Sequence, residues 1–209
     1  MHRIEEAMKE RIVKILYNLI GKGMKPDGKS NGNGFDSGIL HASDQVSPAA
    51  AGQDTSAAQL VDRKTFERIV GESLKKREAG WLLVCDVDRC REINDIYGRD
   101  IGDNVLRYAA CVLCDVFGKC ACIGSPGSDT FVLWLHGIPR DNEDDLRMQI
   151  GVVNDRLLHS AKELPPVTLS VGAAYSKEDD DCRSLVKRAG KALYIVKESG
   201  RCGCEVLTY

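Results

Sequence analysis

Apolar and polar positions divide the 209-residue chain into three stretches with different patterns. Over residues 4–20, apolar side chains recur every three or four positions, with Lys and Glu between them. This spacing predicts an amphipathic helix that packs on the domain or on the same helix of a second chain. Residues 21–58 have no hydrophobic period and are rich in Gly, Ser and Ala, a composition typical of a flexible linker. From residue 60 to residue 209, apolar segments alternate with polar ones, which predicts a globular domain.

Within this domain the pattern predicts helices and strands in a mixed order. The apolar run over 81–87 suits a strand buried on both faces, Asp62 is suited to cap a helix, and Pro126-Gly127 fits a type II turn within a hairpin. One predicted helix begins after Asp62, and four more cover 89–97, 101–117, 142–162 and 182–198. The other predicted strands cover 120–124, 131–135, 167–175 and 204–207. A hairpin inside an alternating series predicts the α+β class, in which helices cover a mixed sheet rather than a doubly wound parallel one.

Charge and hydropathy exclude two classes of protein. The chain has 29 Lys and Arg residues against 31 Asp and Glu residues, a formal net charge of −2. A large nucleic-acid surface needs an excess of cations on one face. No apolar run approaches the roughly 20 residues that span a bilayer. We therefore expect neither a nucleic-acid partner nor a membrane span.

The nine cysteines do not predict a disulfide framework. Their number is odd, and no small-residue cleavage site of a signal peptide follows the N-terminal segment, so we expect a reducing, cytoplasmic location. Cys111 and Cys114 have the spacing of metal ligands, but they fall within a predicted helix and no His pair has matching spacing. We interpret the cysteines as buried thiols that serve as small hydrophobic side chains.

Acidic side chains at strand ends are the candidates for chemistry. The segment Asp86-Val87-Asp88 closes the buried strand, and Asp129 lies at the predicted hairpin tip. Two carboxylates on adjacent strand ends can hold Mg²⁺ beside a phosphate, and Lys197 and Arg201 can supply positive charge to that phosphate.

The longer motifs that contain these residues point to a family. Residues 82–106 read LLVCDVDRCREINDIYGRDIGDNVL, residues 127–131 read GSDTF, residues 169–173 read LSVGA and residues 188–197 read RAGKALYIVK. In this order they resemble the motifs of the GGDEF domain family, the diguanylate cyclases. The resemblance covers residues 60–209. It implies a palm-like, ferredoxin-related central sheet flanked by helices, which agrees with the predicted order of elements.

The resemblance also implies roles for single residues. Asp86 and Asp129 would be the catalytic carboxylates and would hold the Mg²⁺ (or Mn²⁺) that accompanies GTP, helped by the carbonyl of Val87. Asn94 and Asp103 would read the guanine edge, because an amide and a carboxylate match its acceptor and donor groups. The remaining nucleotide-binding positions that the resemblance implies are Arg91, Gly127, Lys197 and Arg201.

Active members of the family work as pairs of protomers. Each protomer brings one GTP, and the two molecules are joined into cyclic di-GMP. The resemblance therefore implies a homodimer, or a signalling partner reached through the N-terminal helix.

The hairpin departs from the family pattern at two positions. Ser128 stands where the second Gly of GGDEF approaches the nucleotide, and Thr130 replaces the Glu. Loss of an active-site charge of this kind costs about 2–4 kcal/mol in barrier, or about 10²–10³ in rate. The family's product-inhibition motif is also missing, since Gly118 and Ala121 stand at its Arg and Asp positions.

Three functions follow as hypotheses. The first is a degenerate GGDEF domain that binds GTP with Mg²⁺ in a regulatory or dimerisation role, with little or no cyclase activity. The second is an active diguanylate cyclase that tolerates GSDTF. The third is a protein-interaction module without nucleotide.

Overall fold

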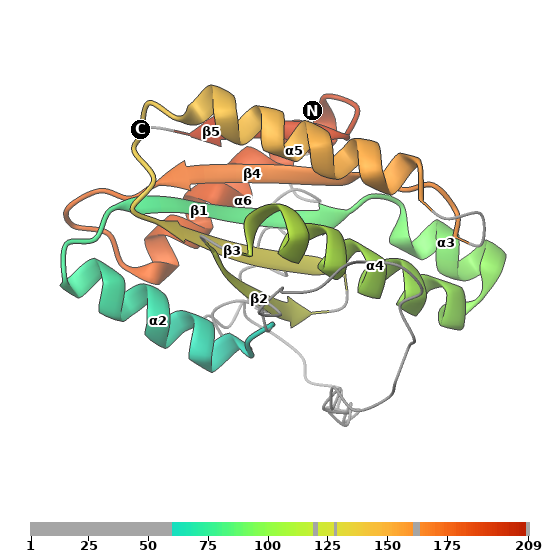
Figure 1. Cartoon of the computed structure of the whole chain (residues 1–209), viewed down its shortest axis with the longest axis horizontal. Helices are drawn as coiled ribbons and strands as arrows, with labels where there is room; N and C mark the ends of the chain where they lie inside the picture. The colour runs from blue at the N-terminus through green and yellow to red at the C-terminus, as the bar shows by residue number, and fades with distance from the viewer. Residues whose placement is uncertain (1–59, 119–120, 128, 161–163, 208–209) are drawn as a thin grey trace, which may run out of the picture.

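A central five-stranded sheet with helices on both faces forms the fold (Figure 1). The computed structural model describes residues 60–118, 121–127, 129–160 and 164–207, so the predicted helix over 4–20 and the linker over 21–58 lie outside the described residues. The helices are α2 (Arg63–Lys75), α3 (Cys90–Tyr97), α4 (Arg99–Phe117), α5 (Glu143–Leu158) and α6 (Cys182–Glu198). The strands are β1 (Gly80–Val87), β2 (Ala121–Gly127), β3 (Thr130–His136), β4 (Leu169–Tyr175) and β5 (Gly203–Leu207).

The strand order β2-β3-β1-β4-β5 puts β1 at the centre of the sheet. β1 is antiparallel to β3 and to β4, β2 is antiparallel to β3, and β5 runs parallel to β4. The expected mixed sheet and α+β class are therefore confirmed.

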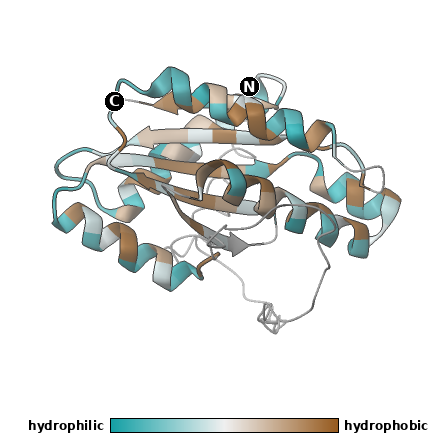
Figure 2. Cartoon of the chain, viewed as in Figure 1, coloured by the Kyte–Doolittle hydropathy of each residue, from teal (hydrophilic) through white to brown (hydrophobic). Residues whose placement is uncertain are grey.

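β1 is buried along its whole length because helices cover both faces of the sheet. Trp81, Leu83 and Cys85 belong to a core formed with α3, α4 and α5, whereas Leu82 and Val84 belong to a second core formed with α2 and α6. Figure 2 shows mostly apolar strands at the centre of the sheet and helices along which apolar and polar residues alternate. The continuous apolar run at 81–87 follows from this two-sided burial.

Local signals set the beginnings of two helices. The Asp62 side chain accepts a hydrogen bond from the Thr65 backbone N–H at 2.9 Å, which caps α2 as expected. At the start of α6, Asp181 and Ser184 form a reciprocal capping box. Gly98, with φ +87°, separates α3 from α4 and lets the chain change direction between them.

The predicted turn at Pro126-Gly127 is wrong, although the hairpin is confirmed. Gly127 belongs to β2 and pairs with Thr130 of β3, so the turn comes after Gly127 rather than at Pro126-Gly127. The β2–β3 register shifts between Gly124 and Gly127, and this irregularity carries the strand past the Pro-Gly pair. Most other bounds agree within one or two residues, but β2 extends to Gly127 rather than 124, and α5 ends at Leu158 rather than 162.

Among the described residues, no helix has both the length and the apolar character needed to cross a membrane.

Candidate functional site

The candidate site lies where β1 ends beside the β2–β3 hairpin. Asp86 pairs with Thr130 across β1 and β3, and the Val87 N–H donates to the Asp129 carbonyl oxygen at 2.9 Å. The expected metal-binding segments are thus adjacent. They meet because antiparallel pairing of β1 with β3 brings the end of one strand to the start of the other.

Lys197 reaches this strand end from the last turn of α6. Its Nζ forms an ion pair with Asp86 Oδ1, and both side chains are almost completely buried. A buried ion pair of this kind is weak evidence for stability, because desolvation of both charges offsets their attraction. It does hold an ammonium group next to an expected ligand of the metal.

Asn94 of α3 contains an unusual polar atom. Its Oδ1 is buried and accepts no hydrogen bond from the described residues. The side chain lies against Gly102 of α4, where a Cβ would come within 1.8 Å of Oδ1. Gly102 therefore permits the close approach, and the next residue, Asp103, is exposed in the same turn of α4.

Cys90, at the start of α3, is close to three expected site residues. Burial raises the pKa of its thiol, and the negative charges of Asp129, Asp86 and Asp103 raise that pKa further. Carboxylates from β1, the hairpin and α4 therefore all lie within electrostatic range of this thiol. Sequence reasoning missed Cys90, because a single cysteine inside an apolar pattern carries no signal of its own.

Asp88 is a second residue whose surroundings the sequence did not reveal. It is 4% exposed and accepts hydrogen bonds from Thr168 Oγ1 and Ser170 Oγ, both at 2.7 Å, and from the Cys202 backbone N–H at 3.3 Å. Arg201 Nε lies 3.9 Å from Asp88 Oδ1. The expected phosphate cation Arg201 therefore belongs to a network centred on Asp88.

The other predicted residues differ in exposure. Arg91 is exposed on α3, and Thr130 is 8% exposed, so its hydroxyl is buried beside Asp86. Gly127 forms the last pair of the hairpin with Thr130. Ser128 lies outside the described residues.

The oxygen atoms of Asp86, Val87 and Asp129 are of the type that Mg²⁺ prefers. Within the described ranges, no group of three or more His, Cys, Asp or Glu residues is arranged to hold a metal ion. Mg²⁺ characteristically uses one or two carboxylates together with water and substrate phosphates, so this donor set fits a metal that arrives with a nucleotide.

The interpretation of the cysteines as buried thiols holds for only part of them. Cys85 and Cys90 are buried, but Cys111 and Cys202 are exposed. All eight cysteines in the described part of the chain are free thiols, and Cys120 lies outside it.

Comparison with known families gives one match over most of the chain. The family model described as "Diguanylate cyclase, GGDEF domain" matches residues 54–202. Diguanylate cyclase DgcM of Escherichia coli K12 is 36% identical over 124 residues, which are 57% of this chain and 29% of DgcM. Diguanylate cyclase A of Treponema denticola is 28% identical over 135 residues, which are 63% of this chain and 36% of the relative. The chain thus spans about a third of the length of these curated relatives.

Solved structures agree with the fold. The GGDEF domain of DgcB from Caulobacter crescentus, solved in complex with c-di-GMP, has a TM-score of 0.64 at 22% identity, over 75% of this chain and 98% of that one. The active GGEEF domain of a diguanylate cyclase from Vibrio cholerae also has a TM-score of 0.64 at 22% identity, over 72% of this chain and 99% of that one.

Proposed function

The chain belongs to the GGDEF domain family, and we propose that it binds GTP with Mg²⁺ in a regulatory or dimerisation role in cyclic di-GMP signalling, with little or no cyclase activity. The relatives that carry the name diguanylate cyclase support the link to cyclic di-GMP. The altered residues of the hairpin motivate the low activity.

The unpartnered Oδ1 of Asn94 is the observation that supports a guanine ligand most directly. A buried acceptor without a hydrogen bond is costly, by about 1–3 kcal/mol, and is rare in native proteins. The N–H groups of a guanine edge are donors that would satisfy it. Asp103, one residue beyond Gly102, offers a second, charged acceptor to the same edge.

The two cationic side chains of the proposed site would bind the phosphates of the nucleotide. Lys197 and Arg201 lie next to Asp86 and Asp88, and each could turn from its carboxylate to a triphosphate oxygen as the nucleotide enters. When bound, Mg²⁺ neutralises phosphate charge and polarises the phosphoryl oxygens. Asp86 and Asp129, with the Val87 carbonyl, are the residues that would hold it.

Thr130 supports the low activity. It is buried beside Asp86 and brings a hydroxyl where active members have a carboxylate. A neutral hydroxyl cannot supply the negative charge that helps to hold metal ions and the attacking group, so the barrier rises by about 2–4 kcal/mol.

Two measurements on the full chain test the proposal. We expect calorimetric titration with GTP and MgCl₂ to show binding that ATP does not reproduce, and incubation with the same mixture to yield little cyclic di-GMP. Asp103→Ala tests the guanine contact. This exposed side chain can be removed without disturbing the core, and its removal should weaken GTP binding.

Each of the other two functions predicts a different result. Robust formation of cyclic di-GMP would favour an active diguanylate cyclase that tolerates GSDTF. If titration with GTP releases no heat, and Asp103→Ala causes no loss, a protein-interaction module without nucleotide would be favoured.

A further inference from the structure

Asp88 joins three segments that are far apart in the sequence. Its backbone N–H donates to the Thr168 carbonyl at 2.8 Å, while its carboxylate accepts from the side chains of Thr168, just before β4, and of Ser170 in β4. The same carboxylate accepts from the Cys202 N–H, 114 positions away in the chain. One buried side chain thus ties the end of β1 to β4 and to the loop before β5.

The loop before β5 has a strained backbone. Arg201 has φ +69° and Cys202 has φ +53°, so two consecutive residues with side chains adopt the left-handed conformation. Left-handed conformations are unfavourable for residues other than Gly, and they persist only where surrounding contacts enforce them. Two hydrogen bonds hold this loop among its described contacts. The Arg201 N–H donates to the Val196 carbonyl oxygen at 2.9 Å, and the Cys202 N–H donates to the Asp88 carboxylate.

The Arg201 side chain also lies near the Asp88 carboxylate. Its Nε lies 3.9 Å from Asp88 Oδ1, yet 39% of the side chain is exposed. Asp88 itself is 4% exposed, because Thr168, Ser170 and the loop enclose it. The carboxylate is therefore fixed within the protein, whereas the guanidinium remains accessible to a ligand.

We propose that Asp88 is a positioning residue that holds Arg201 and Cys202 in the left-handed conformation and thereby aims the Arg201 guanidinium at the nucleotide phosphates. This assignment rests on the proposed function, because it concerns the phosphate side of the same site. Asp88 acts through Arg201 and touches neither nucleotide nor metal.

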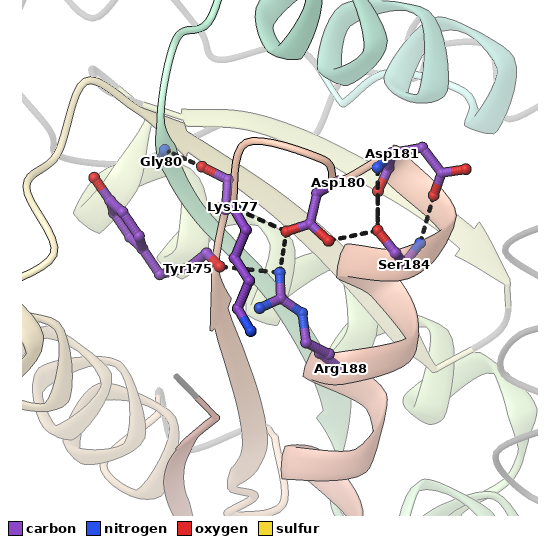
Figure 3. A network of polar contacts seen from close by, with 8 residues as sticks. Gly80, Tyr175, Lys177, Asp180, Asp181, Ser184 and Arg188 are labelled. Carbon is purple, nitrogen blue, oxygen red and sulfur yellow. Dashed lines mark hydrogen bonds and ion pairs between the residues drawn. The ribbon is translucent and has the colours of Figure 1, made fainter. Parts of the chain in front are cut away.

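Asp180 offers a matched control at the opposite end of β1. Its buried carboxylate also pairs with an arginine, Arg188, and accepts hydrogen bonds from Ser184 Oγ at 2.6 Å and from the Lys177 N–H at 2.7 Å (Figure 3). Asp180→Asn therefore removes a comparable buried charge far from the strand end that carries Asp88.

The first experiment needs no nucleotide. Hydrogen exchange of the full chain is followed at the Cys202 amide in the wild type, in Asp88→Asn, in Asp88→Ala and in Asp180→Asn. We expect Asp88→Ala to speed exchange roughly tenfold or more, since a bond to a charged acceptor is lost. Asp88→Asn should give a smaller increase and Asp180→Asn none. Unchanged exchange in Asp88→Ala would overturn the proposal.

The second experiment measures coupling between the two residues. We expect Asp88→Asn to weaken GTP binding about 5- to 30-fold and to leave guanosine binding unchanged, because guanosine has no phosphate. In an Arg201→Ala background the same change should have little further effect. Additive losses, or an equal loss for guanosine, would show that Asp88 does not act through Arg201.

The two experiments separate failure of this inference from failure of the proposed function. If the wild type binds no GTP, the proposed function fails, and the exchange of the Cys202 amide still decides whether Asp88 holds the loop. If Asp88→Ala does not fold, Thr168→Val and Asp88→Asn provide milder changes to the same network. Exchange at Cys202 that none of the folded variants alters would overturn the proposal.

Discussion

Gly102 and Asn94 show how a single side-chain atom shapes the candidate site. Asn94 Oδ1 occupies the space where any Cβ at position 102 would lie. The same oxygen is buried and accepts no hydrogen bond from the described residues. We infer that the glycine keeps this acceptor available for a ligand.

Gly102→Ala tests that inference. Ala is a better helix former by about 0.5–1 kcal/mol, and the atom that it meets is the end of a movable side chain, so we expect little change in thermal stability. Displacement of the Asn94 amide should weaken GTP binding. Calorimetric titration and thermal denaturation of the same samples check both expectations. Unaltered GTP affinity would show that the Asn94 amide does not read guanine.

Thr130→Glu tests the missing carboxylate at the residue scale. A buried glutamate beside Asp86 adds like-charge repulsion, so we expect a lower melting temperature without metal. Added MgCl₂ should restore stability more strongly than in the wild type, and cyclic di-GMP formation should rise by about 10²–10³.

Thr130→Gln is the matched control for that variant, because it has the same size without the charge. Its melting temperature should not respond to MgCl₂ more than the wild type does. An equal response of the Gln and Glu variants would mean that the carboxylate is not what the metal recognises.

At the scale of elements, the packing of α6 on β4 positions the cationic side of the site. α6 carries Lys197 in its last turn, and the loop after it carries Arg201. Gly172 of β4 makes the close approach possible, because a Cβ there would lie 2.1 Å from the Ala189 carbonyl oxygen and 2.1 Å from the Leu193 nitrogen. Backbone atoms of a packed helix cannot move aside as a flexible side chain can.

Gly172→Ala should therefore push α6 away from the sheet. We expect a loss of about 1–3 kcal/mol or more in the free energy of unfolding, measured by urea denaturation. Gly190→Ala, in α6 itself, is the control, since a Cβ there meets no atom within 4 Å. It should be neutral or stabilising by about 0.5–1 kcal/mol. Equal losses in the two variants would contradict the close-packing argument.

At the scale of the whole molecule, the fold determines which thiols can react. Burial raises the pKa of Cys182 and of Cys204 to about 12, and it raises the pKa of Cys85 well above its ordinary value of 9.0. Cys111 and Cys202 are exposed. The thiolate is the reactive form, so the protein's surface and its core should differ sharply in reactivity.

Alkylation followed by mass spectrometry checks this expectation. At mildly alkaline pH we expect iodoacetamide to modify Cys111 and Cys202 first, with Cys85, Cys182 and Cys204 protected until the protein unfolds. Since the folded-state pKa of the partly buried Cys182 and Cys204 thiols is raised, their contribution to stability is complete below the unfolded pKa and is lost as pH rises toward 12. Early labelling of Cys85 would contradict the two-sided burial of β1.

Much of the fold could be predicted because its signals are local. The apolar run of β1 reports burial on both faces, and Asp62 caps α2 through a residue three positions away. The ordered motifs also led to the GGDEF family, which the family match over residues 54–202 confirms. The expectations for residues 4–58, including the dimer contact, stay predictions.

The sequence by itself determined the element order, the α+β class, the family and the identity of the candidate carboxylates and cations, because each depends on side chains close together in the chain. Only the tertiary structure decided the turn after Gly127, the pairing of Lys197 with Asp86 and the network around Asp88. These features join residues that are distant in sequence, or depend on a shift of strand register. Such contacts leave no periodic pattern, since strand pairing and helix packing, rather than local spacing, bring their partners within reach.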